Sequence, residues 1–251
     1  MSLPADLCLG FLDQLLSRAE GLTEVLGPDG GPWDDIKGPQ GESVGLSRLW
    51  VGDGKIRKVA YYGGWVPAID MDTHMVFAFT DPESPVPHFT LDSVHVNVNA
   101  FHLDLIPRAD VATHLKYMDY VYGPITELFQ EGKSLDGLSA ATIGPRQRSI
   151  MSQWMLAYRA SDDAFKQLNK YVGGYLDHWF RLLDEPWPQE VLDDIKDTDL
   201  PERDFRNRSL IFNRDVDEVW NQIEPLFGWD RTELQRLNLL HNEFVAEVPK
   251  A

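Results

Sequence analysis

Two residues on neighbouring apolar segments could together move protons. Asp92 lies in the apolar run of residues 89–94 and His74 in the run of residues 73–79, with a proline-rich turn between them. A carboxylate on the core face of a strand is costly unless it is paired, protonated or used in a reaction. A carboxyl group with a raised pKa beside an imidazole can donate a proton. These segments therefore indicate an acid–base site, with Asp92 and His74 as its candidate residues.

Both residues also have ordinary structural explanations. An aspartate in a strand can face solvent, and a histidine in an apolar run can be a core residue. Val94, Val96 and Val98 alternate in phase with Asp92, which favours an inward-facing carboxyl group with a raised pKa. For His74 taken alone, a structural and a chemical role fit the pattern equally well.

The composition excludes several classes of protein. The 251 residues, 43% of them hydrophobic, are enough for one domain with a sizeable core. The 40 acidic and 23 basic side chains give a net charge of −17, which argues against binding to nucleic acid or to an anionic membrane. No apolar run approaches the ~20 residues that span a bilayer, and residues 1–7 lack the pattern of a signal peptide. We expect a cytoplasmic monomer that binds neither nucleic acid nor membrane.

Metal and phosphate chemistry have little support in the sequence. Cys8 is the sole cysteine, so the chain has no internal disulfide and no thiolate cluster. The seven histidines are scattered, and His95 and His102 alternate along one predicted hairpin in the way that solvent-facing or core histidines do. The glycine-rich phosphate loop and the G-x-S-x-G motif are missing. We therefore expect no metal site.

The hydrophobic pattern divides the chain into two parts. In the first part it predicts a helix over residues 5–26, a loop over 27–45, and strands at 49–51, 55–62, 73–80, 89–99 and 101–105. In the second part it predicts helices over 109–130, 161–183 and 202–249 (interrupted near Gly228), a loop over 134–147 and a strand at 152–158. Strands joined by short turns form an antiparallel sheet.

These elements predict an α+β fold. The simplest arrangement is a single-domain α/β/α sandwich, with a central antiparallel sheet flanked by helices. The domain would span residues 1–251, with a helix and a loop in residues 1–46 and the sheet with its flanking helices in residues 47–251.

The order of these segments resembles the ferredoxin-dependent bilin reductases, such as phycocyanobilin:ferredoxin oxidoreductase, and the related red chlorophyll catabolite reductases. In that family a strand with a histidine–cysteine pair is followed by a proline-containing turn and a strand with a catalytic acid. Residues 74–77, 86–92 and 103–107 follow this order, and the resemblance continues through residues 152–161 to about residue 245. It implies a linear tetrapyrrole, biliverdin or a related bilin, as substrate. It also implies reduced ferredoxin as electron donor, with no cofactor bound to the protein itself.

The resemblance assigns roles to particular residues. Asp92 falls on the family's acid and His74 on its histidine, which would make them proton donors or a proton relay. Arg159 ends a strand whose arginine meets a substrate propionate in the family. Arg146 and Arg148, in the preceding loop, are further candidates for that contact.

A second acid is expected in the C-terminal helical segment. Asp215 follows Asn213 closely and fits the family's Asn-Asp context, so it is the third catalytic candidate. Asp217 and Glu218 compete with it on their spacing to Phe227, and Asp217 is kept as a substrate-binding candidate. Asp215 could equally be a helix-capping acid.

The net charge bears on the implied partner. Ferredoxins are acidic, so a chain with a charge of −17 would repel them unless its basic residues are gathered in one place. Basic residues do cluster along the sequence: Arg146 with Arg148, Lys166 with Lys170, and Arg203, Arg206 and Arg208 with Arg214. We expect such clusters to form a docking patch at the mouth of the site.

Two alternative functions stay open at this point. Residues 59–62 stand where the family has a His-x-Glu pair, which favours a tetrapyrrole carrier that has lost the reaction. A chlorophyll breakdown product is a second candidate substrate, although the red chlorophyll catabolite reductases carry a glutamate where Asp92 stands.

Overall fold

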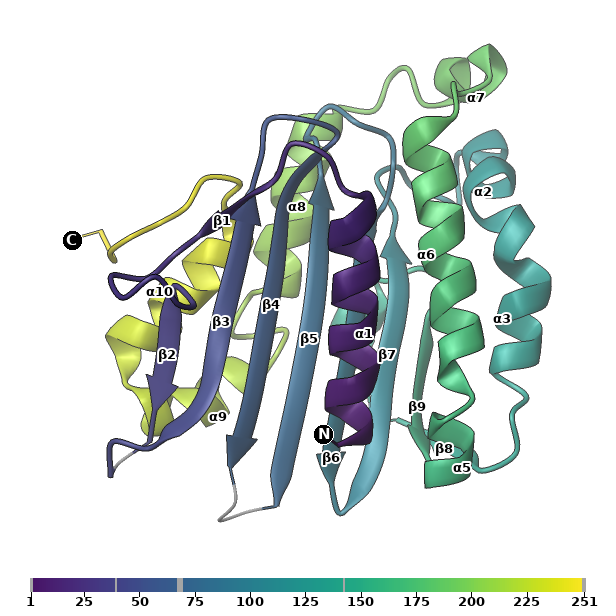
Figure 1. The fold of residues 1–251 in the computed structure, drawn as a ribbon. Helices are drawn as coiled ribbons and strands as arrows, with labels where there is room; N and C mark the ends of the chain where they lie inside the picture. Colours follow the sequence, from purple (N-terminus) through teal and green to yellow (C-terminus); the bar gives the residue numbers. More distant parts are fainter. Residues whose placement is uncertain (1, 39, 67–69, 142, 250–251) are drawn as a thin grey trace.

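One antiparallel sheet forms the centre of the molecule (Figure 1). The computed structural model describes residues 2–38, 40–66, 70–141 and 143–249. The strand order is β1-β3-β4-β5-β6-β7-β9-β8, and β2 pairs with β3 outside this path. The strands are β1 (Thr23–Val25), β2 (Asp34–Lys37), β3 (Ser43–Val51), β4 (Ile56–Val66), β5 (Met71–Thr80), β6 (His88–Val96), β7 (Val98–Ile106), β8 (Leu138–Ala140) and β9 (Leu156–Ala160). The predicted antiparallel sheet is confirmed.

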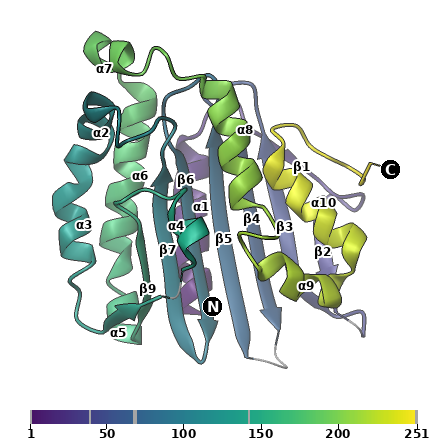
Figure 2. The ribbon, with the colours of Figure 1, turned by 180° about the vertical axis from the view of Figure 1, so that it is seen from behind.

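Helices cover both faces of this sheet. On one face, here called the α1 face, lie α1 (Leu3–Arg18), α2 (Leu115–Tyr122), α3 (Thr126–Gly132) and α6 (Leu168–Asp184) (Figure 1). On the other, the α8 face, lie α4 (Pro145–Arg148), α8 (Leu200–Ile211), α9 (Val219–Phe227) and α10 (Trp229–Leu240) (Figure 2). The remaining short helices are η2 (Gly123–Ile125), α5 (Asp162–Phe165) and α7 (Gln189–Asp194). The predicted α/β/α sandwich is therefore confirmed.

Helix α1 is shorter than its apolar pattern predicts. It begins where the Ser2 side chain accepts a hydrogen bond from the Ala5 N–H at 3.2 Å, which satisfies one of the free donors of the first turn. The pattern predicts a helix as far as residue 26, but α1 ends at Arg18. Gly21 then adopts a φ of +73°, which favours glycine and turns the chain toward β1.

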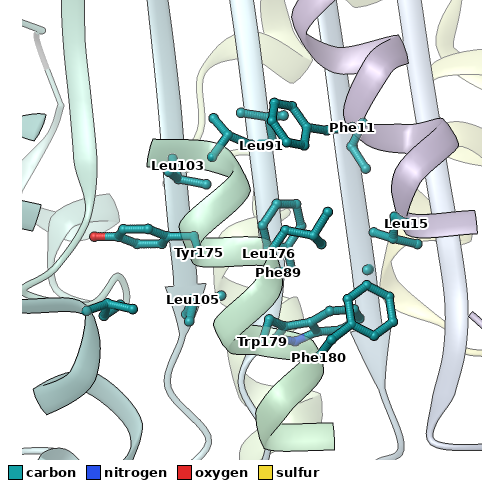
Figure 3. Packing of buried hydrophobic residues seen from close by; sticks show 14 of the residues in the cluster. Phe11, Leu15, Phe89, Leu91, Leu103, Leu105, Tyr175, Leu176, Trp179 and Phe180 are labelled. Atoms are coloured by element: carbon teal, nitrogen blue, oxygen red, sulfur yellow. The ribbon is translucent and has the colours of Figure 1, made fainter. Parts of the chain in front are cut away.

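The larger hydrophobic core lies between the sheet and the α1-face helices. Figure 3 shows side chains of α1, among them Phe11, close to side chains of α6 and of the strands. At its centre Trp179 of α6 is completely buried, and its indole N–H donates to the Pro87 carbonyl at 2.8 Å. Replacing a core tryptophan by alanine typically costs about 3–5 kcal/mol of stability. This core fixes the sheet against the helices of the α1 face.

A smaller core and a buried polar contact attach α8 to the opposite face. His88 of β6 donates a hydrogen bond from Nε2 to Asp204 of α8 at 2.7 Å, and both side chains are buried. Burial lowers the pKa of His88 to about 4, so its imidazole is neutral. Burial alone would raise the pKa of Asp204, but the His88 N–H and the nearby Arg208 and Arg108 outweigh it and lower that pKa to about 2. An ionised Asp204 therefore holds α8 against the sheet.

Lys58 ties the end of the chain to the same face. Its Nζ donates to the carbonyls of Asn238, His241 and Glu243 at 3.0, 2.8 and 2.8 Å. Burial dominates over these contacts and lowers the pKa of Lys58 to about 7. The helix predicted as far as residue 249 ends at Leu240, and carbonyls beyond that end turn toward the Lys58 ammonium.

Other predicted boundaries also differ from the structure. The loop predicted over residues 27–45 contains β2 and the start of β3, and the loop predicted over 134–147 contains β8 and the beginning of α4. β2 and β8 have only four and three residues, which is too short for a periodic pattern. The last helical segment has a break at residues 212–218 as well as the predicted one at Gly228.

The stability of the fold should fall in mild acid because of His178. This α6 residue donates from Nε2 to the Val121 carbonyl at 2.6 Å, and burial lowers its pKa to about 4. The unfolded chain takes up the proton near pH 6.5, so stability is lost as the pH falls from about 6.5 through about 4, by on the order of 3 kcal/mol. Urea unfolding at pH 7, 5.5 and 4.5 should show a shallower decline for His178→Gln. The same change at His114 serves as the control, and an unaltered slope in His178→Gln would contradict the assignment.

Candidate active site

The register of the sheet separates the two predicted proton-handling residues. Asp92 of β6 pairs with Met75 of β5, whereas His74 pairs with Ser93. Successive side chains of a strand point to opposite faces of a sheet. His74 therefore faces α1 and Asp92 faces α8, so the structure does not bring together the two residues of the predicted proton relay.

His74 belongs to a polar network on the α1 face. The Tyr61 hydroxyl donates to His74 Nδ1 at 2.7 Å, and His74 Nε2 donates to Asp72 at 2.9 Å. The backbone of Gly63 passes so close that a Cβ there would lie 3.0 Å from His74 Nδ1. These residues line one side of an open pocket of about 750 Å³ beside the start of α1. Both ring nitrogens of His74 are occupied by the protein itself.

Asp92 faces a different histidine, His102. The two residues are directly opposite each other on β6 and β7, and His102 Nδ1 donates to Asp92 Oδ2 at 3.2 Å. The other polar atom of each side chain, Asp92 Oδ1 and His102 Nε2, is buried and has no hydrogen-bond partner among the described residues. Buried polar atoms are rarely left unpaired, so this pair has one donor or acceptor on each side chain to offer a bound molecule.

Three carboxylates act on the His102 imidazole. Burial alone would lower the pKa of His102, but its bond to Asp92 and the charges of Asp92, Asp104 and Asp217 outweigh burial and raise it. Asp104 is completely buried and accepts hydrogen bonds from the Ser152 N–H at 2.9 Å and from the Ser152 hydroxyl. Burial raises the pKa of Asp104, although His102 and Ser152 lower it in part. The cluster therefore favours a proton on the imidazole.

Of the three candidates for the second acid, Asp217 is the one whose charge acts on Asp92 and His102. Burial and the charge of Asp92 raise the pKa of Asp217, while the Val219 N–H, which donates to it at 3.1 Å, lowers it. Asp215 is exposed: its N–H donates to the Asn213 side chain at 2.7 Å and its carbonyl accepts from Arg146 at 3.3 Å. Glu218 is also exposed. Asp217 is therefore electrostatically coupled to Asp92, whereas Asp215 and Glu218 are exposed.

The three arginines predicted to contact a substrate propionate lie on the α8 face, the same face as Asp92. Arg159 pairs with Ala100, two residues along β7 from His102, and so points to the α8 face. Arg146 and Arg148 lie on α4, which covers this face (Figure 2). All three are exposed, and none forms an ion pair within the described part of the chain.

Most of the other predicted basic clusters are neutralised. Lys166 pairs with Asp163, Lys170 with Glu131, Arg206 with Glu202, and Arg214 with Glu224 and Glu233. Arg208 is buried against Phe79. Of the cluster Arg203 to Arg214, only Arg203 is neither buried nor ion-paired to a described residue, so most of its charge is not available for a docking patch. Arg146 and Arg148 remain as an exposed basic cluster beside the site.

Metal clusters and membrane-spanning helices are both absent from the residues that the structure describes. No group of three or more His, Cys, Asp or Glu side chains among them is placed to hold a metal ion. Within the same part of the chain, no helix has the length and apolar character required to cross a bilayer.

The fold defines a class of α/β/α sandwich built on one antiparallel sheet, with a carboxylate–imidazole pair on the sheet face below α8 to α10. A solved structure with a similar fold is phytochromobilin synthase from tomato, in complex with biliverdin. The two folds agree with a TM-score of 0.68 and 17% sequence identity, over 95% of this chain and 83% of the other. No protein-family model matches the sequence, and no curated protein sequence matches it. The predicted resemblance to the bilin reductases is confirmed at the level of the fold.

His102 was set aside as a core or solvent-facing histidine in the sequence pattern, although a signal for its position exists. The hairpin turns at Asn97, which has a φ of +61°, and residues equally distant from it pair across the strands. This symmetry places residue 92 opposite residue 102. His95, by contrast, points to the α1 face and bonds to Asn99 at 2.9 Å. The partners Ser152 and Asp217 come from distant segments, and no local pattern indicates them.

The contribution of Asp217 to the cluster can be measured on the ligand-free protein. Asp217→Asn removes a negative charge that acts on His102, so the pKa of the His102 imidazole should fall. Asp215→Asn is the matched control, since it removes a charge from an exposed position two residues earlier. An NMR titration of the histidine ring protons reports both values. An equal response to the two variants would show that Asp217 does not face His102.

Proposed function

We propose that this protein reduces a linear tetrapyrrole, biliverdin or a related bilin, bound on the α8 face of the sheet. The observation that carries the proposal is Asp92, whose Oδ1 is buried on this face and lacks a protein partner within the described residues. The fold shared with a protein solved in complex with biliverdin supports it, because the likeness extends over 95% of the chain. A fold alone does not determine function, so the proposal depends on the side chains of the site.

The ligand would lie between the sheet and the helices of the α8 face. Met75 is next to Asp92 in the sheet, and Met155 and Val216 pack against the small core of the same face, so this face offers apolar side chains as well as the polar cluster. Methionine side chains adapt to flat, irregular ligands. A bilin carries two propionates, and the exposed Arg146, Arg148 and Arg159 are suited to charge-assisted contacts with them.

The reaction would couple protons to electrons. Each electron added to a conjugated ligand in a low-dielectric site leaves a charge that a proton must neutralise. Asp92 would donate one such proton. Asp217, on the opposite side of the ligand, would serve as the second acid in place of Asp215, because its carboxyl group faces Asp92 and its pKa is raised by burial. Reduced ferredoxin would supply the electrons, so the protein itself needs no bound redox group.

An absorbance titration with biliverdin tests the proposal directly. The wild-type protein should bind biliverdin, and anaerobic addition of reduced ferredoxin should shift the bound spectrum to shorter wavelength as conjugation is lost. Asp92→Asn should bind biliverdin with similar affinity but slow the reduction by roughly 100-fold or more, because general acid catalysis contributes about that factor.

Asp72→Asn is the matched control, since it removes a carboxylate from the opposite face of the same sheet and should leave the reaction rate nearly unchanged. Binding of biliverdin by the wild type without any reduction would identify a carrier rather than an enzyme. A protein that binds no biliverdin would refute the proposal.

The dependence of the rate on salt tests the ferredoxin partner. Overall, a charge of −17 repels an acidic ferredoxin, whereas Arg146 and Arg148 would attract it locally. If docking uses these arginines, the rate of ferredoxin-supported reduction should fall severalfold as ionic strength rises from about 0.02 to about 0.5 M, because salt screens the attraction. A rate that rises with salt would mean that net repulsion dominates and that docking occurs elsewhere.

A further inference from the structure

His102 has the contacts of a residue that serves a ligand rather than the fold. It is largely buried on the α8 face, and its Nδ1 is used by Asp92 at 3.2 Å. Its Nε2 is buried and has no partner among the residues that the structure describes. The unpaired Oδ1 of Asp92 belongs to the same cross-strand pair. A histidine that only supported the fold would be expected to have both ring nitrogens satisfied, as His74 has.

We propose that His102 is a second catalytic residue, which is held by Asp92 through Nδ1–H and donates its Nε2 proton to the bound tetrapyrrole. This inference rests on the proposed function, and it assigns to His102 the imidazole role that His74 cannot fill. The ligand would be held at the open edge of the pair, between Asp92 Oδ1 and His102 Nε2.

The surrounding charges explain how the imidazole would hold that proton. The charged groups that face His102 are Asp92 from β6, Asp104 from its own strand and Asp217 from the segment before α9. The neighbours in the next strands, Met75 and Ala157, carry no charge. Three carboxylates around one imidazole stabilise its protonated form.

The three acids differ in the hydrogen bonds that they form within the protein. Both oxygens of Asp104 accept hydrogen bonds from Ser152, so Asp104 contributes charge but no open atom. Asp217 caps the start of α9 through the Val219 N–H. Asp92 is left with one oxygen for the imidazole and one for the ligand. Asp104 and Asp217 therefore contribute negative charge, while Asp92 and His102 form the pair that would contact the substrate.

The proton transfer balances in a single step. Reduced ferredoxin gives one electron to the bilin and is itself oxidised, which leaves the bilin as a radical anion. The N–H bond at His102 Nε2 breaks, a bond from that hydrogen to the bilin forms, and the imidazole becomes neutral while Nδ1–H stays bonded to Asp92. A proton from solvent restores the imidazolium before the next electron arrives. Asp92 keeps the ring in the orientation that presents Nε2 to the ligand.

His102→Gln and His74→Gln form a matched pair of variants for the test. Both remove an imidazole from a central strand of the sheet, one from each face. At pH 7, biliverdin titration should give a Kd within about threefold of wild type for both. Single-turnover reduction by ferredoxin should slow by on the order of 100-fold in His102→Gln and stay near the wild-type rate in His74→Gln.

The pH profile separates proton donation from a structural effect. In the wild type the single-turnover rate should be highest at low pH and fall as the pH rises through the pKa of His102. In His102→Gln this fall should vanish. A His102→Gln variant with the wild-type rate and the wild-type pH profile would overturn the inference and leave the proposed function intact.

A measurement on the wild-type protein covers the case in which His102→Gln fails to fold. When biliverdin is added, the ¹⁵N resonance of His102 Nε2 should move strongly, whereas those of His74 should stay in place. Unmoved His102 resonances in a protein that binds biliverdin would overturn the inference. If the wild type binds no biliverdin at all, the proposed function fails and the inference fails with it.

Discussion

The alternation of side chains along antiparallel strands is the constraint on which the rest of the structure depends. Because neighbouring residues of β5 and β6 point to opposite faces, the sheet separates two polar sites that are close in sequence. The α1 face receives His74 and most of the large core, while the α8 face receives Asp92 and His102. A shift of one residue in either strand would exchange these sets and expose the core. The same packing that stabilises the fold therefore determines which acid meets which base.

The two faces differ in how they use polar groups. On the α1 face, buried polar atoms such as those of His74 and His178 are satisfied within the protein. On the α8 face, Asp204 of α8 accepts a hydrogen bond from His88, and Lys58 donates to backbone carbonyls at and beyond the end of α10. Between these attachments the Asp92–His102 pair has unmet hydrogen-bonding capacity. Other buried side-chain atoms, such as Arg208 Nη2 and Thr90 Oγ1, also have no partner among the described residues. The candidate site differs because its two unpartnered atoms belong to an acid and a base that are bonded to each other across two strands.

Much of the fold could be predicted from the sequence, because long periodic segments and tight turns are local signals. The five strands from β3 to β7 and the helix α6 were within reach of that pattern, whereas three-residue and four-residue edge strands such as β8 and β2 were not. The site was predicted less completely. Asp92 lies where the sequence places it, but its partner depends on strand register, and a one-residue difference replaces His74 by Met75 as its neighbour. Asp217 and Ser152 reach the cluster only through tertiary packing, which local patterns do not encode.

Asp92 and His102 come from a single hairpin, so one continuous segment of chain is enough to form the pair. The two residues are ten positions apart and are joined by one turn at Asn97. Contacts of such short sequence separation form quickly in folding and do not wait for distant segments to dock. The pair can therefore be inherited, or grafted onto another sheet, as one continuous segment of chain. By the same logic, a single-residue insertion in that turn would be enough to present Phe101 or Leu103 to Asp92 and to abolish the pair without touching either of its members.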